Sequence, residues 1–213
     1  AIQRVSRQPR ASLPPTIFPT FATLGSRARG VVGLAYRHPR LFRPVLLRAL
    51  STGTDEANAL IRTTRVVTRL RGAAASNVLP EVATATVNLR VVPGSTLDAE
   101  VERIRRDIAD DRIAVTVLEG NDPPPAAPTT GAPWDRIVRS LAASHPEALA
   151  VPYAMLGATD SRHFTRLTPA VYRFTPFELS KAELAGLHAI DESIRVDAWL
   201  RGIAFYRALL ETA

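Results

Sequence analysis

The sequence predicts a mixed fold, α+β in its first part and α/β in its second. Three observations carry this prediction. Apolar and polar residues alternate over residues 83–91, as in a half-buried strand, and apolar residues then recur at helical spacing over residues 97–108. A proline-rich stretch over residues 121–133 follows and is typical of a linker. We therefore expect one domain over residues 1–120 and a second over residues 121–213.

The first 62 residues are expected to form short helices joined by loops. A helix end comes first, a loop with Pro14, Pro15 and Pro19 follows, and helical spacing surrounds Pro39 and Pro44. Proline lacks an N–H and fixes its own φ, so it fits a loop or the first turn of a helix. The pattern does not define where these elements begin and end.

Two strands are expected next. The first runs from Thr63 to about Gly72, because residues 66–70 alternate between two faces. After a turn at Ser76 and Asn77, residues 83–91 form the clearest strand in the chain, with one face buried and one presented.

A helix should follow the turn that begins at Pro93, with Ser95 or Thr96 as its N-cap. Residues 113–118 then have the composition of another strand. The order strand, strand, helix, strand is half of a split βαβ sandwich, so an earlier strand and helix are expected upstream.

Beyond the linker we expect a helix near Trp134, strands over residues 151–156 and 170–174, and a final amphipathic helix over residues 199–210. Alternating elements of this kind favour an α/β layer. Two strands cannot complete a sheet, so their apolar faces are expected to be partly exposed.

Composition narrows the possible chemistry. The 213 residues are 46% hydrophobic and include no Cys, which excludes disulfides and thiolate metal sites and leaves His, carboxylates and hydroxyls. No apolar run approaches the roughly 18 residues of a membrane-spanning helix. The chain starts at Ala1 without a signal-peptide pattern, so we expect an internal or C-terminal piece of a longer protein. The compartment is not encoded in any motif, and the cytoplasm is our default expectation.

Positive charge is concentrated at the start of the chain. Residues 1–71 carry 13 Arg and two acidic residues, a net charge of +11, whereas residues 72–213 carry −4. The basic stretch over residues 36–44 could meet phosphates or anionic lipid, and residues 31–50 could line an acyl channel or touch a membrane. A solvated Arg-rich face is the simpler interpretation, and membrane contact is left open. No standard motif or interleaved aromatic residue indicates a specific nucleic-acid partner.

Four motifs, in this order, resemble a known enzyme family. They are Ser76-Asn77-Val78-Leu79-Pro80, the strand and turn over residues 85–94, Thr159-Asp160-Ser161-Arg162, and His188. Together they look like the zinc-dependent family that contains carboxypeptidase S, aminoacylase and peptidase-like N-acyl-amino-acid hydrolases. The carboxypeptidase S branch fits best, and the resemblance covers the chain from about Ala1 to its end.

The resemblance implies a di-zinc exopeptidase-type α/β catalytic domain with an inserted βαβ sandwich lid that often dimerises. Residues 1–120 would then be the lid, without its first strand, and residues 121–213 the last part of an incomplete catalytic domain. It also implies two zinc ions in the full-length parent, a homodimer through the lid, and cleavage of amide bonds in peptides or N-acyl amino acids. The family's early metal ligands and catalytic glutamate would lie upstream of Ala1. This chain alone is therefore expected to hold no catalytic residue and to be inactive.

The resemblance also assigns substrate-binding residues. Asn77 and Arg90 match residues that grip the substrate carboxylate from the lid, and a guanidinium offers two coplanar donors that suit this group. The alternative for Arg90 is a surface arginine on a half-exposed strand. Asp160 and Arg162 match a motif near the zinc, where Arg162 would contact the carboxylate or orient the site and Asp160 would hold the loop. A plain helix cap at Thr159 or Ser161 is the alternative for that motif.

His188 matches the family's last zinc ligand, and Asp191 or Glu192 could orient its ring. A lone histidine is otherwise a surface or core residue, and the other three histidines match no motif. A second function class stays open: a non-catalytic dimerisation or binding module in which the lid sheet pairs edge to edge.

Overall fold

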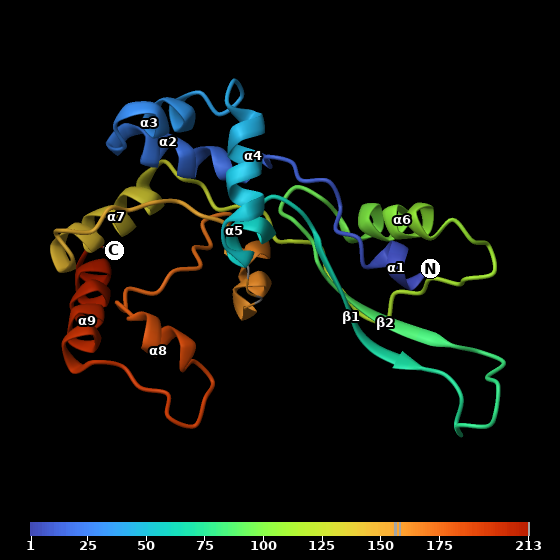
Figure 1. The fold of residues 1–213 in the computed structure, drawn as a ribbon. Coiled ribbons are helices and arrows are strands. Elements are labelled where there is room, and N and C mark those ends of the chain that lie inside the picture. The colour runs from blue at the N-terminus through green and yellow to red at the C-terminus, as the bar shows by residue number, and fades with distance from the viewer. Residues whose placement is uncertain (156, 158, 213) are drawn as a thin grey trace. The chain divides into compact units, whose positions relative to one another are not determined.

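The structure is a computed structural model that describes residues 1–155, 157 and 159–212 (Figure 1). The chain divides into two compact units. Unit 1 comprises residues 1–126 and 153–158, and unit 2 comprises residues 127–152 and 159–213. The segment over residues 153–158 therefore belongs with the N-terminal unit although it follows the proline-rich linker in the sequence.

Unit 1 begins with short helices around a small apolar core. Pro19 and Pro44 stand in the first turns of two of these helices, where a missing N–H costs no hydrogen bond. The buried core residues are Ile17, Phe21, Ala35, Leu46 and Ile61. The helices are α1 (Ile2–Val5), η1 (Pro15–Ile17), α2 (Phe18–Arg27), α3 (Gly30–Arg37), α4 (Arg43–Thr52) and α5 (Asp55–Ala59).

Helices α2 and α3 pack closely because glycines lie at and beside their contact. A Cβ at Gly25 would lie 3.1 Å from a backbone nitrogen of α3, and a Cβ at Gly33 would lie 2.1 Å from the carbonyl oxygen of Ala28. The rings of Phe21 and Tyr36 stack between the two helices with centroids 5.2 Å apart. This packing determines which face of α3 points into the core.

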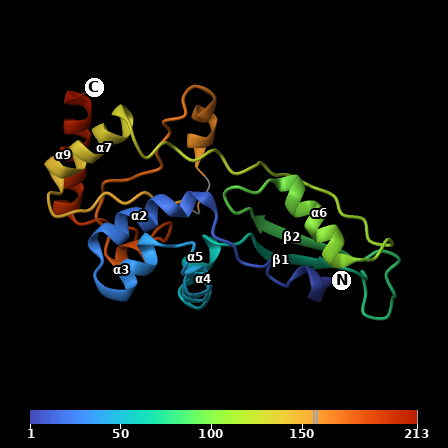
Figure 2. The ribbon, with the colours of Figure 1, turned by 90° about the horizontal axis from the view of Figure 1, so that it is seen from above.

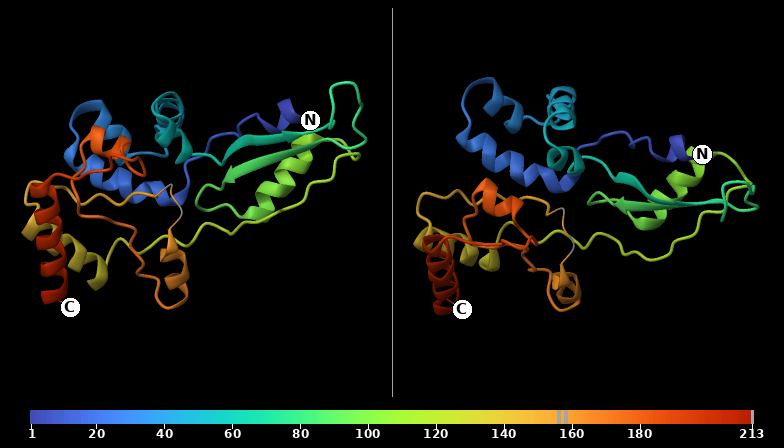
Figure 3. Two further views of the ribbon diagram at one scale, coloured as in Figure 1. Left: turned by 90° about the horizontal axis from the view of Figure 1, so that it is seen from below. Right: turned by 60° about the horizontal axis from the view of Figure 1, so that its bottom comes forward.

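Strands β1 (Thr64–Arg71) and β2 (Thr84–Arg90) form an antiparallel hairpin, which confirms the two strands predicted from alternation. The register pairs Thr64 with Arg90. The connecting loop over residues 72–83 extends beyond the paired ends of the strands in each ribbon view (Figures 1, 2 and 3).

Helix α6 (Leu97–Ile108) covers one face of the hairpin (Figure 2). Thr96 caps it as predicted, because its hydroxyl accepts the N–H of Ala99 at 3.2 Å. The helix ends at Ala109, whose φ of 45° lies in the left-handed region. The apolar residues shared by the helix, the hairpin and their neighbours are Val5, Val87, Leu89, Ile104, Ile108 and Val115.

Three further strands predicted from the sequence are wrong for the residues that the structure describes. Residues 113–118, 151–155 and 170–174 form no strand, and Leu156, the end of the second predicted strand, lies outside the described residues. A strand needs a neighbour that completes its hydrogen-bond ladder. Within the described chain the sheet contains β1 and β2 alone. The carbonyl of Val115 instead accepts a hydrogen bond from an arginine of α6 at 3.1 Å.

Unit 2 consists, in its described residues, of helices and irregular segments, so the α/β layer expected there is not formed. Helix α9 packs on α7 and buries Ala198, Gly202 and Phe205. A Cβ at Gly202 would lie 2.1 Å from Cε1 of Phe177, so this ring lies directly on the helix backbone. Other faces of α9 leave apolar residues exposed, among them Val196, Trp199, Leu200, Ile203 and Leu210. The helices are α7 (Ala132–Ser144), η2 (Asp160–Arg166), α8 (Lys181–Ala185) and α9 (Val196–Glu211).

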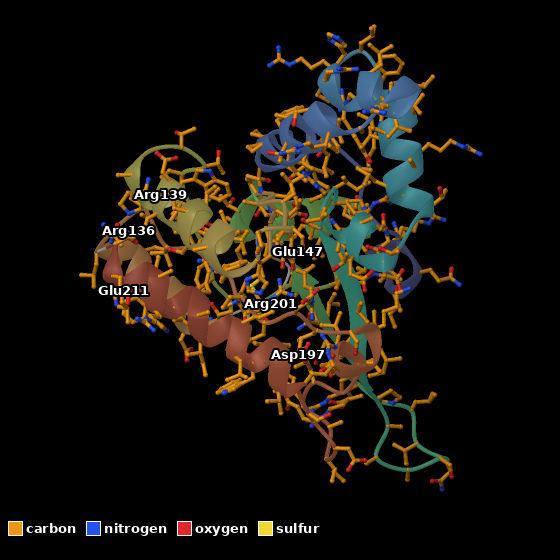
Figure 4. All side chains as sticks on the ribbon, turned by 90° about the vertical axis from the view of Figure 1, so that its left-hand side faces the viewer. Arg136, Arg139, Glu147, Asp197, Arg201 and Glu211 are labelled. Atoms are coloured by element: carbon orange, nitrogen blue, oxygen red, sulfur yellow. The ribbon has the colours of Figure 1, made fainter. Side chains whose placement is uncertain are left out.

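Ion pairs lie on the surface of unit 2. Figure 4 shows Arg201 of α9 beside Glu147, with which it forms an ion pair, and its guanidinium also lies 2.9 Å from a carboxylate oxygen of Glu178. The hydrogen bond from Arg201 lowers the pKa of the Glu147 carboxyl. Across the described residues of both units, each helix is too short or too polar to traverse a lipid bilayer.

Candidate substrate-binding residues and metal ligand

Two of the predicted substrate-binding residues lie on the hairpin, at opposite ends of β2. Arg90 is the exposed last residue of the strand. Asn77 lies in the loop over residues 72–83, in a turn where the N–H of Val78 donates to the carbonyl of Ala75 at 3.3 Å. A strand of seven residues spans about 20 Å at roughly 3.4 Å per residue. One carboxylate therefore cannot contact both side chains within a single hairpin of this shape.

The Thr159-Asp160-Ser161-Arg162 motif begins the short 3-10 helix η2. The hydroxyl of Thr159 accepts the N–H of Ser161 at 3.2 Å, so the helix-cap interpretation of this motif is confirmed for Thr159. Asp160 stands in the first turn, and Nε of Arg162 donates to Nε2 of His163 at 3.4 Å. The substrate-binding roles of Asp160 and Arg162 stay predictions.

His188 occupies a tight turn after α8. Its φ of 66° lies in the left-handed region, which histidine adopts more readily than most residues, and the residue is exposed. Its backbone N–H donates to a carboxylate oxygen of Glu192 at 3.0 Å. Glu192, predicted as a residue that could orient the imidazole, therefore binds the backbone of His188 in this structure.

Glu183 closes the loop that carries His188. Its carboxylate accepts the N–H of Ser180 at 2.7 Å in a capping box, and it also accepts the backbone N–H and the guanidinium of Arg195 at 2.8 and 2.6 Å. Hydrogen bonds from Ser180 and then from Arg195 lower the pKa of Glu183 from its ordinary 4.5 to about 2. Both ends of the segment over residues 186–194 are thus tied to one carboxylate.

The predicted site residues divide between the two units. Asn77 and Arg90 lie in unit 1, whereas Asp160, Arg162 and His188 lie in unit 2. A zinc site in a protein takes at least three protein ligands. Among the residues that the structure describes, no group of three or more His, Cys, Asp and Glu could hold a metal ion. The side chains present here do not by themselves fit a zinc site, and the role of His188 as one ligand stays a prediction.

Arg65, a fully buried charged residue of β1, was not predicted from the sequence. Its Nη1 lies 2.5 Å from Oδ2 of Asp107, and its Nη2 lies 3.9 Å from Oε2 of Glu100, whose side chain is also fully buried. The amide of Gln8 accepts the backbone N–H of Arg65 at 3.3 Å and donates to its carbonyl at 3.0 Å. The available signal was a pair of carboxylates seven residues apart that flank Ile104 on the apolar face of α6.

Comparisons with known proteins agree with the order of the motifs. Residues 35–114, which include the hairpin and α6, match the family described as the peptidase dimerisation domain. A probable carboxypeptidase S-like 2 of Dictyostelium discoideum is 33% identical over 80% of this chain and 33% of its own length. The N-fatty-acyl-amino acid synthase/hydrolase PM20D1 of Homo sapiens is 32% identical over 85% of this chain and 37% of its own length.

The chain belongs to the M20 peptidase family. A more distant relative, the carboxypeptidase S of Saccharomyces cerevisiae, is 26% identical over 69% of this M20 chain and 31% of its own length. The chain therefore spans about a third of the length of these relatives. No solved structure matches it. M20 peptidases are hydrolases and are generally zinc-dependent. The match to the dimerisation domain and the named relatives confirm the family prediction made from residues 76–80, 85–94, 159–162 and 188.

Proposed function

We propose that this chain is the dimerising and carboxylate-binding portion of an M20 hydrolase that cleaves amide bonds of N-acyl amino acids or peptides. The position of Arg90 carries the proposal, because it stands exposed at the end of β2 inside the region that matches the dimerisation domain. A guanidinium pairs with a carboxylate through two parallel hydrogen bonds. Fatty-acyl amino acids and peptide C-termini, the substrates that the relatives' names indicate, both carry this group.

We assign the outer edge of β2 as the edge that pairs with a second copy of the chain. On β1, the amide of Gln8 already occupies both backbone groups of Arg65. A sheet edge with unpaired N–H and C=O groups is a template for another strand. Antiparallel pairing of two β2 strands would bring the loop of one copy, with its Asn77, toward Arg90 of the other. The dimer thus offers Asn77 a substrate contact that a single hairpin of this shape does not.

The absence of native cysteine makes the dimer directly testable. Asn88→Cys places a thiol in the middle of β2, and Thr68→Cys places one on β1 as the matched control. We expect the Asn88→Cys chain to form a disulfide-linked dimer under mild oxidation much faster than the Thr68→Cys chain. Light scattering should give a mass of twice 23.1 kDa for the unmodified chain. A monomer in light scattering, or equal cross-linking of both variants, would contradict the β2 interface.

The catalytic proposal is tested on the gene product that carries these residues. An N-acyl amino acid and its methyl ester, which lacks the free carboxylate, are compared for Arg90→Ala and Arg90→Lys. Loss of a charge-assisted hydrogen bond should lower kcat/KM for the acid by about 10- to 100-fold in Arg90→Ala, with the ester nearly unaffected. Arg90→Lys should fall between, because an ammonium lacks the planar fork. Equal losses on acid and ester would show that Arg90 does not bind the carboxylate.

A non-catalytic dimerisation or binding module is the second candidate. It is favoured by the match of residues 35–114 to the peptidase dimerisation domain. A gene product that forms the β2 dimer but hydrolyses neither N-acyl amino acids nor blocked dipeptides, with zinc supplied, would favour this candidate. His188, Asp160 and Arg162 would then have no role in a reaction.

A further inference from the structure

Helices α3 and α4 and the turn between them expose large aliphatic side chains. Val31 is 75% exposed, Leu41 76% and Val45 61%. The same helices also contribute Ala35 and Leu46 to the buried core. The exposed aliphatic residues, called the α3–α4 face from here on, are Val31, Val32, Leu34, Leu41 and Val45.

The turn that joins the two helices has a defined geometry. The carbonyl of His38 accepts the N–H groups of Leu41 and Phe42 at 3.0 and 3.1 Å. Phe42 then packs against the core, while its neighbour Leu41 is left exposed. The close contact between Gly25 of α2 and the backbone of α3 holds α3 in place. The apolar side chains are therefore presented by a packed scaffold.

The helices and the turn that form this face carry charge of one sign. Residues 27–48 include six arginines, all exposed, and no acidic residue; the first acidic residues of the chain, Asp55 and Glu56, stand in α5. Exposed apolar residues of α9 differ, because that helix itself carries Asp197 and Glu211, and Glu211 pairs with Arg207. An aliphatic face whose own helices and turn carry only cations suits a partner that is both anionic and apolar. A single-stranded nucleic acid would instead be bound by stacking on aromatic side chains, and the exposed residues here are aliphatic.

We propose that the α3–α4 face docks on the surface of an anionic lipid bilayer. The aliphatic side chains would enter the boundary between headgroups and acyl chains, and the arginines would lie at the lipid phosphates. The proposal concerns a surface remote in sequence from Arg90 and does not depend on hydrolysis. It also gives a chemical reason for the charge imbalance of the first 71 residues.

Vesicle sedimentation of the full 213-residue chain tests the proposal. The probes are vesicles of phosphatidylcholine alone and vesicles with one quarter phosphatidylglycerol. We expect binding to the anionic vesicles only, weakened by salt. Arg40→Glu with Arg43→Glu should lower the partition coefficient about 30-fold or more, because two basic residues are lost that each contribute about 1 kcal/mol at such a surface. Val31→Ser with Leu41→Ser and Val45→Ser should lower it by a similar factor because inserted apolar area is lost.

The matched control removes the same kind of side chain from α9. Leu200→Ser with Ile203→Ser and Leu210→Ser should leave binding unchanged, and far-UV circular dichroism reports whether each variant is folded. Equal binding to both kinds of vesicle, an equal loss in the α9 control, or no binding by the folded chain would overturn the proposal.

A labelled variant separates lipid insertion from simple attraction to polyanions, and it does not require removal of several side chains. Leu41→Cys carries an environment-sensitive dye as the one thiol of the chain, with Leu210→Cys as the control position. We expect a blue shift of the Leu41 probe on anionic vesicles, no shift on heparin or single-stranded DNA, and no shift of the Leu210 probe. The same shift of the Leu41 probe on anionic vesicles, heparin and single-stranded DNA would show nonspecific charge binding and overturn the proposal.

Discussion

The hairpin with α6 and the pair of helices α7 and α9 place their charges in opposite ways. Beneath α6, Arg65 and Glu100 have fully buried side chains, and the ion pair with Asp107 completes the cluster. On α9, Arg201 meets Glu147 and Glu178, which lie outside the helices, with its side chain one-third exposed. Buried charges depend on each other, since water cannot replace a lost partner, whereas surface charges are solvated with or without one.

The effect of a substitution on stability should therefore differ between the two regions. In unit 1 the buried cluster determines how α6 sits on the hairpin that carries Arg90. In unit 2 the ring of Phe177 packs closely on α9 at Gly202, and ion pairs mainly hold loops in place.

Removal of Arg65 should be the most damaging change. Arg65→Met leaves the buried Glu100 with the partly exposed Arg103 as its remaining counter-charge, and we expect unfolding in urea to show a loss of about 3 kcal/mol in the free energy of unfolding. The double variant Arg65→Met with Glu100→Leu should recover part of this loss, because neither charge remains to be desolvated. Arg201→Met, the matched control in unit 2, should cost far less. A similar loss for Arg65→Met and Arg201→Met would remove the distinction between the two regions.

Gly202→Ala should have the next largest effect. The new Cβ would stand 2.1 Å from Cε1 of Phe177, a ring that also stacks on Trp199 with centroids 5.0 Å apart. Alanine favours a helix by about 1 kcal/mol over glycine, but overpacking costs about 1–3 kcal/mol, so we expect a small net destabilisation in thermal unfolding. Ala204→Ser, on an exposed side of the same helix, is the control. A stabilised Gly202→Ala chain would show that the Phe177 ring moves away without cost.

Loss of the Glu183 carboxylate, which ties both ends of the loop over residues 186–194, should have the smallest and most local effect. This effect depends on pH. Because the folded pKa of Glu183 lies below its ordinary value, the charged form favours the closed loop fully above about pH 4.5. This contribution is lost as the pH falls from about 4.5 to about 2. At pH 7 the variant Glu183→Gln should be cleaved faster by a protease within residues 186–194. Glu211→Gln, which removes a partner of Arg207, serves as the control. Unchanged cleavage of the Glu183→Gln chain would show that the loop closes without this carboxylate.

Local pattern was sufficient for the elements of the hairpin region. Alternation identified β1 and β2, and the Thr96 cap with its apolar spacing identified α6, because neighbouring residues decide these features. The strands predicted over residues 113–118 and 170–174 failed for a different reason. Their composition suits a strand, but a strand forms only beside another, and in the described chain neither segment pairs with β1 or β2.

The predicted site residues show the same contrast between local sequence pattern and tertiary structure. The order of Asn77, Arg90, the Thr159–Arg162 motif and His188 was enough to identify the M20 family, since it depends on residue types and spacing alone. The positions of these residues in space could not be read from spacing, and the structure puts Asn77 and Arg90 at opposite ends of β2.

The family, the hairpin, the helix caps and the strong positive charge of the first 71 residues were readable from the sequence, because each depends on neighbouring residues or on composition. The burial of Arg65 against Glu100 and the packing of Phe177 on Gly202 became visible in the three-dimensional structure. The same is true of the exposure of the aliphatic side chains of α3 and α4. These features depend on which segments meet, and such contacts are determined by the packing of the whole chain rather than by any local run of residues.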